Sequence, residues 1–312
     1  MSPLSKETFQ RRLEAVAAAT EAALAAALSA TPLPGEIARP ERLLLAMRHA
    51  TLGGGKRLRP FLVIESAALF GVPEAKAMGA AAAIECVHCY SLVHDDLPAM
   101  DNDELRRGRP SVHRAFDEAT AILAGDALLT LAFDIIARDD TDPDPIVRVA
   151  LTQLLARAAG IGGMAGGQLL DLQAEGRFAD GKPFACSPEE IGRLQTMKTG
   201  TLIQASCEAG AILGRVDAKA RQALSHYARA LGLAFQIADD LIDAEGETAA
   251  AGKRVGKDKV HGKATFVSAL GADGARKRLR ELVREAEAAL MPFGARGAML
   301  AACAHFVAER KA

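Results

Sequence analysis

The sequence predicts an all-α protein built as a large helical bundle. Apolar residues recur three and four positions apart along almost the whole chain, while the alternation typical of strands is hard to find. Turn-forming residues punctuate this pattern, and the clearest loops cover residues 31–35, 139–145 and 181–188. A chain of 312 residues with 50% hydrophobic content can bury a substantial core. No fixed-period repeat or low-complexity linker divides it, so we expect a single domain over residues 1–312.

Capping residues and prolines set the expected helix boundaries. The run Ser187 to Glu190 combines a capping serine, a proline suited to the first turn and two acidic residues, so a helix should begin there. Leu97 precedes Pro98 and is therefore pushed out of helical geometry, which ends the helix before it. In chain order, the expected helices are 5–29, 40–51, 58–70, 74–97, 117–138, 146–174, 189–213, 218–244, 273–290 and 294–309.

The composition argues against several classes of protein. The 38 basic and 39 acidic residues nearly balance, so no overall electric field favours nucleic acid or an acidic membrane surface. Five cysteines in a chain of this length suit reduced thiols in a cytosol better than a disulfide framework. No uncharged stretch reaches the roughly 18 residues that suggest a membrane span. We expect a cytoplasmic protein with no transmembrane segment and no nucleic-acid partner.

Two aspartate clusters lie far apart in the chain, and each follows an apolar run that resembles the end of a buried helix. The clusters are Asp95, Asp96 and Asp101, and Asp239, Asp240 and Asp243. The carboxyl end of a helix carries partial negative charge, so carboxylates there are unfavourable unless a cation neutralises them. One cluster alone could be a solvated helix end, but two such clusters in apolar sequence favour joint metal binding. Carboxylate oxygens suit Mg²⁺, which completes its shell with water and substrate phosphates.

The spacing of the second cluster selects two of its members. Asp239 and Asp243 are four residues apart and share one helix face, whereas Asp240 points elsewhere.

Basic residues recur in segments that also contain glycine. The glycine-rich segment around Lys56 and Arg59 lacks the Ser or Thr of a Walker phosphate loop. Its glycines are instead expected to end one helix and open the next, with both cations directed at an anion. The guanidinium groups of Arg106 and Arg107 can each donate a pair of hydrogen bonds to phosphate oxygens. These cations, with the lysines of the glycine-rich segment 252–263, exceed what one phosphate needs, which points to two diphosphates.

In this order, the motifs resemble those of the trans-prenyltransferases, the short-chain isoprenyl diphosphate synthases, over essentially the whole chain. The matching segments are residues 54–60, the first aspartate cluster with residues 105–108, Gly125–Asp126, residues 166–168 with Asp171, Lys198–Thr199, residues 235–243 and Gly262–Lys263. The resemblance implies the isoprenoid synthase fold around a central cavity, usually in a homodimer. It implies that isopentenyl diphosphate is condensed with an allylic diphosphate, dimethylallyl or geranyl, with Mg²⁺ as cofactor.

The resemblance also assigns roles to residues of this chain. The implied metal ligands are Asp95, Asp96, Asp101, Asp239 and Asp243. The implied contacts of the allylic diphosphate are Arg106, Lys198, Gln236, Lys253 and Lys263, with Thr199 supporting the cation. The implied contacts of isopentenyl diphosphate are Lys56, Arg59, His88 and Arg107. The implied catalytic set is Asp95, Asp101, Arg106, Lys198, Thr199, Asp239 and Lys253.

Product length is expected to depend on Tyr90. This residue is five positions before Asp95 on a helix, about 7.5 Å along the axis, so its ring can form a floor for the growing chain. The resemblance is to bacterial farnesyl diphosphate synthases. Small Ser91 leaves room beside the ring, which keeps a geranylgeranyl diphosphate synthase as the alternative.

Two more remote functions remain open. A terpene cyclase needs no second diphosphate site, so the additional basic residues argue against it. A non-catalytic regulatory subunit of a prenyl synthase should lack some of the aspartates or lysines, yet every expected position is filled.

Overall fold

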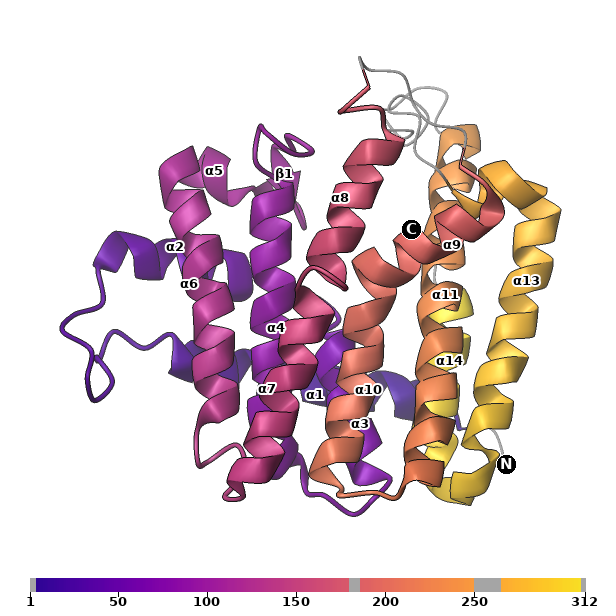
Figure 1. Cartoon of the computed structure of the whole chain (residues 1–312), viewed down its shortest axis with the longest axis horizontal. Coiled ribbons are helices and arrows are strands. Elements are labelled where there is room, and N and C mark those ends of the chain that lie inside the picture. Colours follow the sequence, from indigo (N-terminus) through magenta and orange to yellow (C-terminus); the bar gives the residue numbers. More distant parts are fainter. Residues whose placement is uncertain (1–3, 180–185, 250–264, 310–312) are drawn as a thin grey trace. The chain divides into compact units, whose positions relative to one another are not determined.

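The computed structural model describes residues 4–179, 186–249 and 265–309, and these are almost entirely helical (Figure 1). The earlier helices are α1 (Lys6–Ala27), α2 (Glu41–Thr51), α3 (Leu58–Ala68), α4 (Glu74–Asp95), α5 (Val112–Ala115), α6 (Glu118–Ala137) and α7 (Pro145–Ala159). The later ones are α8 (Met164–Ala174), α9 (Pro188–Gln195), η1 (Thr196–Gly200), α10 (Thr201–Leu213), α11 (Ala218–Ala249), α13 (Phe266–Leu290), η2 (Met291–Gly297) and α14 (Ala298–Glu309). The predicted all-α fold class is therefore confirmed.

The structure differs from the expected elements in several details. The helix expected over 146–174 is interrupted after Ala159 and resumes at Met164, because the intervening glycines favour a turn. The helix expected over 189–213 contains a five-residue π-helix, η1. The hairpin of β1 (Leu105–Arg106) and β2 (Arg109–Pro110) was not foreseen, since two-residue strands leave no readable alternation. The expected capping box at Ser187 is confirmed.

The chain forms two compact units. One, which we call the amino-terminal unit, comprises residues 10–153 and 212–214, and the carboxyl-terminal unit comprises residues 1–9, 154–211 and 215–312. Within the amino-terminal unit, α4 packs against both α3 and α6. Residues 80–84 of α4 are buried, and four of the five are alanine, which lets neighbouring helices approach closely.

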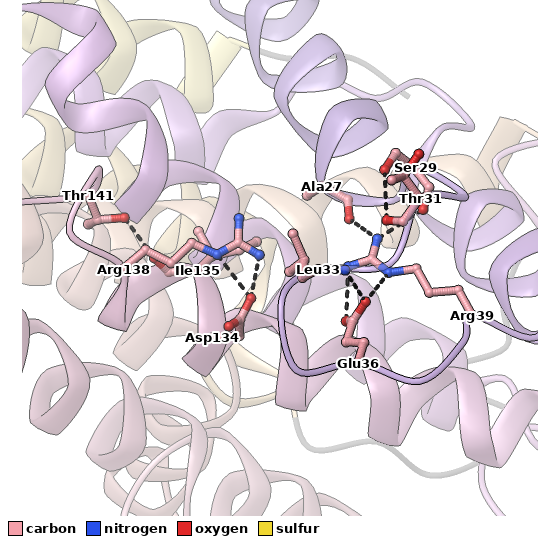
Figure 2. A network of polar contacts seen from close by, with 10 residues as sticks. All are labelled: Ala27, Ser29, Thr31, Leu33, Glu36, Arg39, Asp134, Ile135, Arg138 and Thr141. Atoms are coloured by element: carbon pink, nitrogen blue, oxygen red, sulfur yellow. Dashed lines mark hydrogen bonds and ion pairs between the residues drawn. The ribbon is translucent and has the colours of Figure 1, made fainter.

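A polar network fastens the connection between α1 and α2 (Figure 2). The Arg39 guanidinium donates to the carbonyls of Ala27 and Ser29, both at 2.9 Å, and to the Glu36 carboxylate at 2.7 Å. This hydrogen bond lowers the pKa of Glu36 below its ordinary value. Arg138, the residue after α6, donates to Asp134 of that helix at 3.0 Å. Arg39 thus ties the carbonyl end of α1 to the segment that leads into α2.

In the carboxyl-terminal unit, α11 packs against α13 and α14. Tyr227 of α11 is fully buried, and its hydroxyl donates to the carbonyl of Leu300 on α14 at 2.8 Å. A second link uses the buried Asp240 of α11, which accepts the backbone N–H of Phe266 at 2.7 Å. This carboxylate therefore satisfies an amide at the start of α13 that has no partner within its own helix.

Glycines bring α8 against η1. A Cβ atom at Gly167 would lie 2.2 Å from the backbone nitrogen of Lys198 and 2.6 Å from its Cα. Because both atoms belong to the backbone, neither can move aside as a flexible side chain would.

Replacing Gly167 with Ala should lower the free energy of unfolding by at least about 2 kcal/mol, because the added methyl overlaps backbone atoms of η1. Urea denaturation followed by circular dichroism measures the change. Gly162→Ala is the matched control, since a Cβ at Gly162 meets no atom within 4 Å. Equal stability of the two variants would contradict the close approach.

Candidate active site

The glycine-rich segment before α3 is held by a buried ion pair. Arg57 has a left-handed backbone conformation, with φ 46°. Its Nη1 donates to Glu85 of α4 at 2.7 Å, its Nη2 donates to the carbonyl of Thr51, and both charged side chains are buried. As expected, the glycines separate two helices, α2 and α3. Lys56 on one side of Arg57 is exposed, and Arg59 on the other side is half-buried.

The unforeseen hairpin presents two of the predicted diphosphate-binding residues. Arg107 (φ 53°) and Gly108 (φ 75°) form its two-residue turn, and positive φ at both positions matches the twist of paired strands. Arg107 donates to the carbonyl of Gly54. A Cβ at Gly55 would lie 2.9 Å from the Arg107 guanidinium carbon, so the glycine segment leaves space for this arginine. The hairpin is therefore docked on the segment that carries Lys56.

The other end of the hairpin is fastened to α2. His49 Nε2 lies 2.7 Å from the carbonyl oxygen of Pro110, and His49 Nδ1 lies 2.9 Å from Nη2 of Arg109. Because a carbonyl only accepts and a guanidinium only donates, Nε2 carries the proton and Nδ1 accepts. These groups, with Asp96 and Arg107, line a small pocket beneath the hairpin. His49 had no predicted role.

His88 lies among the arginines predicted to bind isopentenyl diphosphate. Burial holds the pKa of His88 well below its usual range, and the positive charges of Arg59 and Arg107 lower it further. The imidazole is therefore neutral at pH 7. Two other predicted contacts of this substrate, Arg59 and Arg107, thus act on His88 through their charges. Lys56, the fourth, belongs to the same segment as Arg59.

The first aspartate cluster stands where α4 ends. Asp95 and Asp101 are half-buried, and the backbone N–H of Asp101 donates to the carbonyl of Asp95 at 2.9 Å. Asp96 differs because its buried carboxylate accepts from Arg106 Nε at 3.0 Å. Burial raises the pKa of Asp96, although the Arg106 hydrogen bond opposes this effect. Arg106 also lies 3.3 Å from Asp103, so the arginine stands amid carboxylates.

Within the carboxyl-terminal unit, the π-helix η1 carries Lys198 and Thr199. Lys198 forms an ion pair with Asp171 of α8. Asp171 belongs to a motif of the sequence but had no predicted role of its own. A π-helix inserts one extra residue into a helical turn, and such insertions are frequent at functional sites. Lys198 lies within this insertion, and its ammonium group faces Asp171 of α8.

The second aspartate cluster lies on α11 with its members on different faces. Asp239 is half-buried and Asp243 is exposed, in keeping with a shared face that remains accessible. Gln236 is half-buried one turn before Asp239. Asp240 instead anchors α13, as described above, which agrees with its predicted different direction. The predicted contacts Lys253 and Lys263 lie outside the described residues.

The donor set of the two clusters fits Mg²⁺ in its chemistry. Asp95, Asp101 and Asp239 offer carboxylate oxygens, the ligand type that this ion prefers. Among residues 4–179, 186–249 and 265–309, no group of three His, Cys, Asp or Glu side chains is gathered into a metal site. Mg²⁺ commonly takes only one or two carboxylates and keeps positions for phosphates, so it does not require such a cage.

The model of the polyprenyl synthetase family matches residues 40–291, which includes all of these groups. The chain belongs to the polyprenyl synthetase family. Farnesyl diphosphate synthase of Escherichia coli is 44% identical over 90% of this chain and 91% of its own length. The enzyme of the same name from Geobacillus stearothermophilus is 43% identical over 87% and 89%. The apo crystal structure of an FPP/GFPP synthase from Zymomonas mobilis aligns with a TM-score of 0.85 at 44% identity, covering 96% of this chain and 99% of that one.

These comparisons confirm the predicted family and the isoprenoid synthase fold. Residue roles in this polyprenyl synthetase stay predictions. Sequence reasoning missed the supporting pair Arg57 and Glu85. The signal for it was Glu85, a single carboxylate inside the apolar run of α4, because a charge buried there needs a partner.

His88→Gln should weaken the dependence of stability on pH. Unfolded His88 takes up a proton near pH 6.5, whereas folded His88 does so only at lower pH. The folded state therefore loses stability as pH falls between these values, by up to about 1.4 kcal/mol per pH unit. Urea denaturation of both proteins between about pH 7 and 5 measures the difference. Parallel curves for wild type and variant would contradict a depressed pKa.

Proposed function

We propose that this polyprenyl synthetase condenses isopentenyl diphosphate with dimethylallyl and geranyl diphosphate, and that its main product is farnesyl diphosphate. The chain is a prenyltransferase by family. The observation that carries the substrate assignment is the docking of Arg107 on the glycine segment that bears Lys56 and precedes Arg59. The charges of Arg59 and Arg107 also act on the buried His88 and lower its pKa. Three cationic side chains and one neutral imidazole, with no nucleophile among them, suit the binding of a diphosphate. The similarity to curated farnesyl diphosphate synthases supports the product.

The proposed reaction uses positive charge instead of covalent catalysis. Arg106 and Lys198 contact the allylic diphosphate and stabilise the charge that develops as the carbon–oxygen bond breaks. Bound Mg²⁺, held by Asp95, Asp101 and Asp239, would supply further stabilisation of that charge. Lys56, Arg59 and Arg107 hold isopentenyl diphosphate so that its double bond attacks the allylic carbon. Thr199 supports the cation, and the released diphosphate accepts the proton that is lost.

Two of these cations are already paired with carboxylates in the chain. Arg106 pairs with Asp96, and Lys198 pairs with Asp171. Carboxylate partners fix the direction of each side chain without neutralising all of its donors. An arriving diphosphate therefore meets oriented cations, which lowers the entropic cost of binding.

Tyr90 is proposed as the floor that stops chain growth, with Ser91 beside it. Tyr90 is half-buried on α4. Burial raises its pKa, and the Asp95 carboxylate raises it further, so the hydroxyl stays neutral and the ring lies near the first aspartate cluster. An aromatic ring at this depth leaves room for a fifteen-carbon chain and opposes further addition. Because Ser91 is small, a twenty-carbon product remains the second candidate.

Product analysis tests this function. Pure protein is incubated with isopentenyl diphosphate and with dimethylallyl, geranyl or farnesyl diphosphate, and products are separated by chromatography. Farnesyl diphosphate should accumulate from the two shorter primers and should not be extended. A chelator should abolish turnover, and Mg²⁺ should restore it. Asp239→Asn should lower kcat by at least about a hundredfold, because a carboxylate that holds the metal is lost.

Other results would assign a different activity. Extension to twenty carbons would identify a geranylgeranyl diphosphate synthase. Turnover of an allylic diphosphate without isopentenyl diphosphate would identify a cyclase. Condensation only after a second polypeptide is added would identify a regulatory subunit.

We further propose a cytoplasmic homodimer in which the outer face of α6 contacts a second copy. By length and composition alone, three helical stretches could cross a membrane, Glu118–Ala137, Pro145–Ala174 and Phe266–Glu309. In the first of these stretches, only 44% of an apolar segment of 18 residues is buried. Leu123 and Ile122 of α6 remain 57% and 44% exposed. Aspartates 126 and 134 share the exposed side of this helix, which favours a protein partner over lipid.

Sedimentation equilibrium should show a dimer for the wild type and a monomer for Leu123→Glu, because a buried charge would oppose association. Ile161→Glu is the matched control, since Ile161 is equally apolar, 94% exposed and not on α6. A dimeric Leu123→Glu variant would refute this interface. Co-sedimentation of the wild type with lipid vesicles would favour a membrane contact instead.

A further inference from the structure

The proposed floor residue is supported by a neighbouring ring. His94 lies one helical turn after Tyr90 on α4, and their ring centroids are 5.8 Å apart with an interplanar angle of 80°. This edge-to-face arrangement is a favourable geometry for aromatic rings. The rotation of the Tyr90 ring is therefore limited by where the His94 ring stands.

The position of His94 is fixed in turn by α6. Its Nε2 donates to the carbonyl of Ile122 at 3.1 Å, and the same nitrogen lies 3.9 Å from the Asp126 carboxylate. Both partners belong to one turn of α6, so the imidazole spans from α4 to the neighbouring helix. A side chain anchored at both ends has few alternative rotamers.

Gly125 provides the space that the imidazole occupies. A Cβ at this position would lie 2.1 Å from Nε2 and 2.4 Å from Cδ2 of His94. The ring therefore rests directly on the backbone of α6, and any side chain at position 125 would displace it. Gly125 is also part of a motif for which the proposed function gives no role.

We propose that His94, seated on Gly125, is a positioning residue that holds the Tyr90 ring across the path of the growing chain and so determines product length. The inference rests on the proposed function of Tyr90 as the floor. In this arrangement His94 does not contact the substrate. It acts through Tyr90, and α6 supplies the rigid surface behind both rings.

The test measures product length instead of rate, because a purely structural role of His94 would lower activity without changing the product. His94→Ala removes the ring that supports Tyr90. The ratio of twenty-carbon to fifteen-carbon product should rise by about tenfold, the discrimination typical of a small change in an apolar pocket. His94→Leu keeps most of the volume over Gly125 and should give the same shift if the Ala variant fails to fold.

A double-mutant comparison shows whether His94 acts through Tyr90. Tyr90→Ala should lengthen the product by itself, and adding His94→Ala should change it no further. Cys89→Ala is the matched control, since Cys89 is buried on the same helix but lines the pocket beneath the hairpin. That variant should keep the fifteen-carbon product.

Failure of the inference is distinguishable from failure of the floor proposal. Longer products from Tyr90→Ala with unchanged products from both His94 variants would overturn the role of His94 and leave the floor intact. Unchanged products from Tyr90→Ala would remove the floor and the inference together, while the condensation activity would stand. A shift caused equally by Cys89→Ala would also overturn it.

Discussion

The buried ion pair of Arg57 and Glu85 is the interaction on which the amino-terminal part of the site depends. Leaving either charge buried without the other typically costs about 3–5 kcal/mol, so the pair enforces one arrangement of the glycine segment on α4. With Arg57 turned inward, Lys56 lies exposed and Arg59 falls in the first turn of α3. The hairpin then docks on that fixed segment through Arg107. One internal charge pair thus sets the direction of several external cations.

A second principle of the site is that cations proposed to act on substrate are oriented by carboxylates. Asp96 holds Arg106 within one unit, and Asp171 holds Lys198 within the other. The aspartates of the first cluster therefore differ in their exposure and in their partners. Asp95 and Asp101 have the partial exposure that a metal ligand needs, whereas Asp96 is buried against an arginine. Similarly, Asp240 secures α13 while its neighbour Asp239 remains half-buried.

The sequence alone determined the fold class and the family, and it predicts the chemical nature of the site. The helical periodicity of apolar residues is a local property, so helices can be recognised from it without knowing how they pack. The capping box at Ser187 and the glycine boundary before α3 were equally local, and both are present. The aspartate clusters and the basic motifs followed from residue type and order, which identify ligand chemistry without coordinates.

Only the tertiary structure decided how those residues are held. The hairpin forms because Arg107 and Gly108 adopt positive φ while Arg109 and Pro110 contact His49 of α2. Strands of two residues are too short to be predicted from the sequence pattern. The π-helix at Lys198 lies where α8 and η1 approach closely, and helix propensity does not encode that approach. The partners of Arg57, Asp96 and His94 lie 10 to 28 residues away in sequence. Such contacts depend on which helices become neighbours, and packing of the whole core determines that.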